Sequence, residues 1–148
     1  MNDFYYTIPA TLGLVGEKSP TWSAVFEMHP ASHYNSSVVY LKTHETMLAE
    51  LSEKGLHVYL AFANPKIPKG RLYPYERVVE YFGREYFRST LAFMIPMAIM
   101  QIESDDNKRD KVFAPRIGLW GCDMDLNSEY ERERPCVEYW VARARTRC

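Results

Sequence analysis

Apolar and polar side chains alternate most regularly in the middle of the chain. Residues 56–62 place apolar side chains at every second position, with His57 and Tyr59 between them, and this period of two predicts a strand. Continuous apolar runs predict three further strands, over residues 12–16, 22–29 and 117–121. Residues 38–41 are compatible with either a strand or the start of a helix.

A helical spacing of apolar residues predicts four helices. They are expected over residues 43–54, 74–82 and 90–103 and from Pro135 onward. Gly55 and Gly83 suit the position just after a helix, where the backbone often turns into the left-handed region. Ser89 can cap the third helix, and Pro96 is expected to kink it or to mark its true start. Loop compositions are found at 30–37, 63–73 and 104–111.

The alternation of strands and helices predicts the fold class. Because parallel strands need a crossover connection, strand–helix–strand units imply a mostly parallel sheet with helices on both faces. We therefore expect an α/β fold, a three-layer Rossmann-like sandwich of four to five mostly parallel strands, in a single domain over residues 1–148. The segments 12–16 and 22–29 are too close for a crossover helix, so either they pair as a hairpin or the first is no strand.

Composition and charge exclude several classes of protein. The 148 residues carry a formal net charge of −1, so the chain lacks the basic footprint of a general nucleic-acid binder. Its longest apolar run, residues 91–100, is about half of what a membrane-spanning helix needs. The three cysteines form no Cys-x-x-Cys pair and are odd in number, which favours a reducing compartment. With no basic leader after Met1, we expect a cytoplasmic protein that engages no membrane.

Polar side chains follow the predicted strands, at the edge where open α/β sheets bind ligands. Glu27 and His29 end the strand predicted at 22–29, and an imidazole there can serve as a general acid or base. A histidine that only hydrogen-bonds its own loop is the alternative. The other three histidines are expected at the surface or in loops: His33, His44 and His57.

Carboxylates gather after the last predicted strand. Asp123 and Asp125 follow it directly, with Glu129 close behind. Oxygen ligands of this kind could hold Mg²⁺ beside a ligand phosphate, or Asp123 could accept hydrogen bonds from a sugar hydroxyl. Alternatively, the segment is a solvated acidic loop that caps the last helix.

Residues 13–19 superficially suggest a phosphate-binding loop. They form no Walker A motif, because Glu17 stands between Gly16 and Lys18 and the spacing fails. A phosphate cradle also needs a helix N-terminus behind it, for which there is no room before Trp22. A plain β-turn is the better interpretation.

Several motifs together resemble a family of phage and prophage Rossmann-like proteins. In that family a strand of roughly Leu-Trp-Gly-Val-Asp-Met leads to Ser-Glu-Tyr, then to Gln-Arg-Pro and a helix. The matching stretches here are Gly-Leu-Trp-Gly-Cys-Asp-Met at 118–124, Ser-Glu-Tyr at 128–130 and Arg-Pro-Cys-Val-Glu-Tyr-Trp at 134–140. Phe-Glu-Met-His at 26–29 and Tyr-Phe-Arg-Ser-Thr at 86–90 also match in order and spacing, so the resemblance spans roughly residues 22–142.

That family is distantly similar to archaeal 6-hydroxymethylpterin pyrophosphokinase-like proteins and to Rossmann-like sialyltransferases. The resemblance therefore implies a protein that binds a nucleotide or nucleotide sugar at its strand ends, and it leaves open whether the protein is a transferase. The matching positions are Glu27, His29, Ser89, Thr90, Gly121, Asp123, Glu129, Tyr130, Arg134 and Pro135. With the chemistry above, we expect His29 and Asp123 to be catalytic, Asp123 and Asp125 to hold Mg²⁺, and the other matching polar residues and Gly121 to bind the ligand.

The chain departs from the family pattern at both ends. Family members begin with a strand, a glycine-rich turn and a helix, of which residues 12–19 retain at most a remnant, and they close with a strand after the last helix. Glu133 also stands where the family has Gln. A sheet truncated at both ends leaves an edge on which a second copy or another chain can pair. The alternative function is therefore a non-enzymatic interaction protein, a virion component or a regulator of a host protein, and a phage-encoded chain would act in the host cytoplasm.

Overall fold

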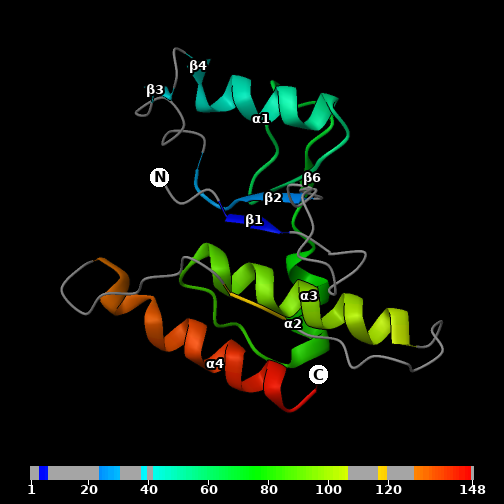
Figure 1. Cartoon of the computed structure of the whole chain (residues 1–148), viewed down its shortest axis with the longest axis vertical. Helices are drawn as coiled ribbons and strands as arrows, with labels where there is room; N and C mark the ends of the chain where they lie inside the picture. Colours follow the sequence, from blue (N-terminus) through cyan, green and yellow to red (C-terminus); the bar gives the residue numbers. More distant parts are fainter. Residues whose placement is uncertain are drawn as a thin grey trace, which may run out of the picture. The chain divides into compact units, whose positions relative to one another are not determined.

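The computed structural model describes the backbone of residues 4–6, 24–30, 38–39, 42–106, 117–119 and 129–147 (Figure 1). It describes side chains over residues 24–30, 44–104, 117–119 and 131–147. The contacts within the chain divide it into two compact units, Met1–Pro74 and Tyr75–Cys148, and each is considered by itself below. That the whole chain forms a single domain stays a prediction.

The first unit contains a small open sheet with the strand order β1-β2-β5-β6. Its strands are β1 (Phe4–Tyr6), β2 (Ala24–Glu27), β5 (His57–Leu60) and β6 (Arg71–Leu72). The strands β2, β5 and β6 run parallel, whereas β1 pairs antiparallel with β2. Two shorter strands, β3 (Val38–Val39) and β4 (Lys42–Thr43), pair with each other. The predicted α/β class is thereby confirmed.

Helix α1 (His44–Glu53) stands between the parallel strands β2 and β5 in the chain and packs on one face of them. Val25 and Val58 lie opposite each other in the register. Both are buried against Leu48 of α1, together with Leu60 and Ile67. These five side chains form the core of the first unit.

Helix α1 ends as the sequence predicts. Gly55 has a φ of 91°, in the left-handed region that glycine enters without strain. The N–H of Leu56 donates to the carbonyl of Leu51 over 3.1 Å, and the N–H of Gly55 donates to that of Ser52 over 3.2 Å. This pair of bonds is the Schellman motif, and it turns the chain directly from α1 into β5.

The connection from β5 to β6 carries more structure than the loop predicted at 63–73. It includes β6, a strand of two residues that is too short to show a period in the sequence. Ile67 is 2% exposed and its carbonyl accepts a hydrogen bond from the N–H of Gly70 over 2.8 Å. A Cβ atom at Gly70 would lie 2.6 Å from Cδ1 of Leu60 and 3.0 Å from the carbonyl oxygen of Ile67. Close packing of this turn on β5 therefore requires glycine.

We expect Gly70→Ala to lower the free energy of unfolding by about 1–3 kcal/mol, because the added methyl group must displace packed neighbours. Urea denaturation followed by circular dichroism measures the loss. In a Leu60→Val background, which lacks the Cδ1 atom in question, the same substitution should cost less. Equal costs in the two backgrounds would show that Leu60 does not exclude a side chain at this position.

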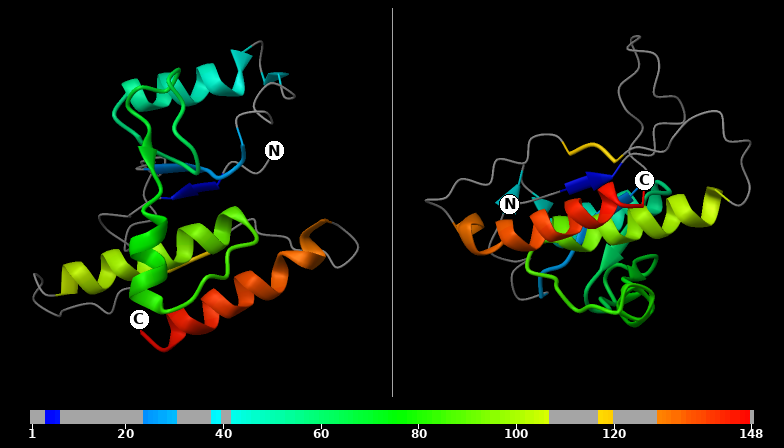
Figure 2. Two further views of the ribbon diagram at one scale, coloured as in Figure 1. Left: turned by 180° about the vertical axis from the view of Figure 1, so that it is seen from behind. Right: turned by 90° about the horizontal axis from the view of Figure 1, so that it is seen from below.

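The second unit is helical in its described part. It contains α2 (Tyr75–Phe82), α3 (Thr90–Asp106), the 3₁₀ helix η2 (Glu129–Arg132) and α4 (Arg134–Arg145). Helices α3 and α4 lie side by side (Figure 2). Gly83 follows α2 with a φ of 64°, and the hydroxyl of Ser89 accepts a hydrogen bond from the N–H of Ala92 at the start of α3. Pro135 lies in the first turn of α4, so all four predicted helices are confirmed.

Helix α3 begins at Thr90, as predicted, and ends later than predicted. It is one helix from Thr90, so Pro96, whose side chain is fully buried, does not mark its start. It also extends to Asp106, into the segment predicted as a charged loop, because a helix that has already formed gains one backbone hydrogen bond with each residue it adds. In the part of the chain that the structure describes, no helix combines the length and the apolar character needed to cross a membrane. A cytoplasmic location stays a prediction.

Trp140 on α4 lies at the centre of an aromatic cluster in the second unit. Its side chain is fully buried, and its ring centroid lies 5.0 Å from that of Phe82 and 5.4 Å from that of Phe87. The indole N–H donates to the carbonyl of Tyr86 over 2.7 Å, and the thiol of Cys136 donates to the same oxygen over 2.9 Å. Phenylalanine, tyrosine and tryptophan make up 14% of the chain, and this cluster contains several of them.

Residues 117–119 form no strand, contrary to the prediction for 117–121. An apolar run becomes a strand only where a neighbouring strand accepts its backbone hydrogen bonds, and Gly118 weakens the tendency further. The strand predicted at 12–16 lies outside the described residues. Within them, the antiparallel partner of β2 is β1, a segment in which the sequence shows no clear period.

Candidate functional site

A buried carboxylate lies at the carboxyl end of β2. Glu27 is 6% exposed. Its Oε1 atom accepts a hydrogen bond from the backbone N–H of His29 over 2.9 Å and lies 2.6 Å from Nδ1 of the same residue. Its Oε2 atom is hydrogen-bonded to Nε2 of His44. We call Glu27, His29 and His44 the Glu–His cluster.

The register of the sheet determines where this cluster forms. Glu27 lies opposite Leu60 and two residues after Val25, so its side chain points to the face that packs on α1. His44 is the first residue of α1. The end of a strand and the start of the helix that covers it therefore bring a carboxylate and an imidazole together in the border of the core.

His44 is buried, with 5% of its surface exposed, contrary to the prediction of a surface or loop histidine. Its partner Glu27 is 17 residues away in the sequence, so no local pattern around His44 reveals the contact. His57 is exposed, as predicted. His33 lies outside the described residues. Sequence reasoning therefore identified Glu27 and His29 and missed the third member of the cluster.

The electrostatics of the cluster favour a charged carboxylate. Burial raises the pKa of Glu27, but hydrogen bonds from His44 and from the backbone and ring of His29 outweigh it, so the pKa lies below the ordinary value of 4.5. Glu27 is consequently ionised at neutral pH and acts only as a hydrogen-bond acceptor. It holds two imidazoles, and its predicted direct contact with a ligand stays a prediction.

The end of the neighbouring strand carries a second polar group. The N–H of Ala61 donates to the carbonyl of Glu27 over 3.1 Å, so the ends of β2 and β5 are adjacent. Asn64, three residues further on, donates from Nδ2 to Oε1 of Glu45 over 2.8 Å. Lys66 pairs with Oε2 of the same carboxylate over 2.8 Å, and the hydrogen bonds of Lys66 and Asn64 lower the pKa of Glu45. These contacts attach the loop after β5 to α1.

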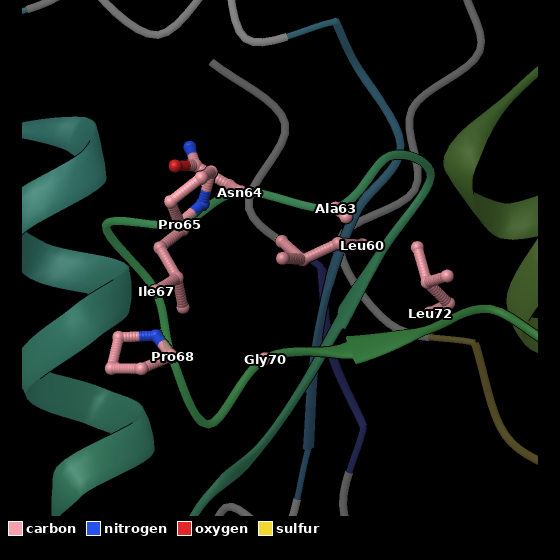
Figure 3. Close-up of a pocket in the computed structure, with 8 residues that line it drawn as sticks. All are labelled: Leu60, Ala63, Asn64, Pro65, Ile67, Pro68, Gly70 and Leu72. Atoms are coloured by element: carbon pink, nitrogen blue, oxygen red, sulfur yellow. The ribbon is translucent and has the colours of Figure 1, made fainter.

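An open hollow of about 400 Å³ lies beyond the end of β5 (Figure 3). Asn64 and Pro65 stand on one side of it, Leu72 stands on the other, and Leu60 lies between them. The lining residues are Leu60, Ala63, Asn64, Pro65, Ile67, Pro68, Gly70 and Leu72. Asn64 is the one polar side chain among these eight, so the hollow itself offers no charge to a ligand.

The predicted site residues of the second unit have structural partners. Ser89 caps α3, and Ser89 and Thr90 are 8% and 7% exposed. Arg134 donates from Nε to Oε1 of Glu138, one helical turn further along α4, over 2.7 Å. These contacts account for Ser89 and Arg134 without a ligand. Their predicted contacts with a ligand stay predictions.

The remaining predicted site residues are described only in part or not at all. Glu129 and Tyr130 belong to η2, but their side chains are not described. Gly121, Asp123 and Asp125 lie outside the described residues. Within the described part of the chain, no three side chains of histidine, cysteine, aspartate or glutamate form a group that could hold a metal ion. The Mg²⁺ site at Asp123 and Asp125 stays a prediction.

No protein-family model, curated protein or solved structure matches the chain. The resemblance to phage and prophage Rossmann-like proteins therefore stays a prediction.

Proposed function

We propose that this chain binds a nucleotide or nucleotide sugar at the carboxyl end of its parallel strands, with His29 in contact with the ligand. The observation that carries the proposal is the Glu–His cluster. In it buried Glu27 pairs with the imidazole of His29, whose side chain is 48% exposed, and buried His44 holds the other oxygen of Glu27. Open α/β sheets bind ligands beyond the carboxyl ends of their strands, and Glu27 and His29 stand at such an end. A carboxylate-held imidazole can hydrogen-bond a ligand or move a proton.

The finer parts of the proposal extend this site. The parallel pair β2–β5 with α1 between them in the chain is the unit from which Rossmann-like sheets are built, and it supports a Rossmann-like arrangement. Asp123 and Asp125 are the proposed ligands of Mg²⁺. Transfer of the bound group, with His29 and Asp123 in the reaction, is the activity that the resemblance suggests.

We expect nucleotides or nucleotide sugars to raise the melting temperature of the protein. A ligand at one hundred times its Kd adds about 2.7 kcal/mol to the stability of the folded state, which thermal denaturation detects easily. The screen uses ATP, UDP and UDP-glucose, each with and without Mg²⁺. His29→Gln should abolish the shift, whereas His57→Gln, at an exposed residue of the opposite end of β5, should retain it. Absence of a shift with every ligand would contradict the proposal.

Asp123 provides an independent test of the same function. We expect Asp123→Asn to abolish nucleotide binding while the melting temperature of the ligand-free protein stays nearly unchanged, because a carboxylate that serves only to bind a ligand contributes little to stability. Thermal denaturation with and without UDP-glucose gives both quantities. The N-cap of α4 is Glu133, which overturns the expectation that the acidic segment caps the last helix. If Asp123 instead stabilises the turn that leads to Pro135, the variant loses about 1 kcal/mol of stability and binds as before, and that outcome would remove Asp123 from the site.

A second function is favoured by the apolar surface beside β6. Phe62 and Leu72 are 60% and 58% exposed, and β6 is the terminal strand of the described sheet. Such an edge can pair with a second copy or with another protein chain, as expected of a non-enzymatic interaction protein. Size-exclusion chromatography with light scattering separates the two functions. A monomer that binds nucleotides supports the first, and an obligate oligomer that binds none supports the second.

A further inference from the structure

We propose that Glu27 is a positioning residue: it keeps the hydrogen of neutral His29 on Nδ1, so that Nε2 meets the ligand as a hydrogen-bond acceptor. His44 acts with it by holding the other oxygen of the same carboxylate. The placement of the hydrogen follows from the geometry of the cluster alone. The contact with a ligand rests on the proposed function.

The geometry determines which nitrogen carries the hydrogen. An ionised carboxylate has no hydrogen to donate, so each ring nitrogen that faces it must be the donor. Nδ1 of His29 lies 2.6 Å from Oε1 of Glu27 and is therefore the N–H. A neutral imidazole has only one N–H. Nε2 of neutral His29 consequently has a lone pair and acts as a hydrogen-bond acceptor.

The carboxylate is fixed from both sides. Oε1 accepts a hydrogen bond from the backbone N–H of His29 and also faces the imidazole ring of that residue. Oε2 is hydrogen-bonded to His44. The side chains of Glu27 and His44 are 7% and 6% exposed, so the packed border of the core restricts both. The same carboxylate–imidazole arrangement sets the tautomer of the base in serine hydrolases. Two buried groups thus orient one half-exposed ring.

This orientation selects the chemistry of the group that His29 meets. An acceptor at Nε2 pairs with a hydroxyl or N–H of the ligand, and a nucleotide or nucleotide sugar offers such donors on its ribose, its sugar and its base. A phosphate oxygen is only an acceptor and would require the protonated ring. The neutral form of His29 therefore contacts a hydroxyl or N–H of the sugar or base and not a phosphate oxygen.

The tautomer can be measured on the unmodified protein. Long-range ¹H–¹⁵N spectra of the full chain with labelled histidine distinguish a protonated ring nitrogen from a bare one. The spectra are recorded at about pH 8.5, some two units above the ordinary histidine pKa of about 6.5. We expect a protonated Nδ1 and a bare Nε2 at His29 and a protonated Nε2 at His44. A bare Nδ1 at His29 would overturn the proposal, and this measurement needs no variant to fold.

Glu27→Gln distinguishes positioning from mere packing. A carboxylate offers two acceptors, whereas an amide of the same shape offers one acceptor and one donor. The backbone N–H of His29 keeps the amide oxygen on its own side, so the NH₂ group faces His44. We expect the hydrogen to leave Nε2 of His44, with His29 and the exposed reference His57 unchanged. If neither His29 nor His44 changes, the carboxylate does not set the tautomers.

The ligand contact is tested by adding ATP, UDP and UDP-glucose to the labelled protein. We expect a ligand that raises the melting temperature to shift the Nε2 resonance of His29 and to leave that of His57 in place. Binding without a shift at His29 would overturn the ligand contact and leave the proposed function standing. If none of the three binds while the tautomers are as expected, the proposed function fails and the positioning role of Glu27 stands.

Discussion

Replacing Trp140 with alanine is expected to lower the free energy of unfolding by about 3–5 kcal/mol, the range found for large aromatic side chains removed from a packed core. Trp140 is fully buried, and the rings of Phe82, Phe87 and Tyr139 lie against it. Its removal leaves a cavity that α2 and the segment after it would have to close. Because the folded state of a domain is stable by only about 5–15 kcal/mol, the loss is a large share of the total. Urea denaturation followed by far-ultraviolet circular dichroism measures it.

Trp140→Phe is the matched control. Phenylalanine keeps most of the ring contacts and loses the N–H that donates to the carbonyl of Tyr86. That oxygen still accepts from the thiol of Cys136, so it is not left unpaired, and the cost should stay near 1–2 kcal/mol. If Trp140→Phe is as unstable as Trp140→Ala, the indole hydrogen bond and not the aromatic packing provides the stability that Trp140 adds.

Local signals in the sequence predict the helices and one strand well. Gly55 and Gly83 adopt the left-handed backbone that ends α1 and α2, and Ser89 caps α3, because each of these choices depends only on residues within one turn. The alternation over residues 56–62 contains β5, since Val58 and Leu60 face the core of the first unit. Each of these features is determined by residues within a few positions of it in the sequence.

Long-range pairing explains what the sequence did not show. Strands β1 and β6 have three and two residues, too few for a period, and exist because β2 and β5 accept their hydrogen bonds. Residues 117–119 are the converse case, an apolar run without a strand. His44 belongs to the candidate site only through Glu27, which the sheet register and α1 bring to it. Contacts of this kind depend on the fold, and no window of sequence contains them.

Removing the carboxylate of the Glu–His cluster is expected to be the second costly change. We expect Glu27→Ala to lower the free energy of unfolding by about 1–3 kcal/mol, because it leaves the buried imidazole of His44 without its acceptor. Glu53→Ala is the matched control in the same unit. Glu53 pairs with Lys69 over 2.6 Å, but both side chains are more than half exposed, so its loss should cost at most about 1 kcal/mol. Equal losses of unfolding free energy in the two variants would show that burial does not increase the stabilising effect of the cluster.

The cost of Glu27→Ala should also depend on pH with a defined sign. The pKa of Glu27 in the folded protein is lower than 4.5, since its hydrogen bonds to His44 and His29 outweigh the effect of burial. A carboxylate whose pKa falls on folding contributes stability above its unfolded pKa and loses it as the pH falls through the folded value. The difference in stability between wild type and Glu27→Ala should therefore be largest near neutral pH and narrow below about pH 4.5. Urea titrations at a series of pH values measure it. A difference that widens as the pH falls below about 4.5 would mean that the cluster stabilises the fold through the protonated form of Glu27 and not through the ionised carboxylate.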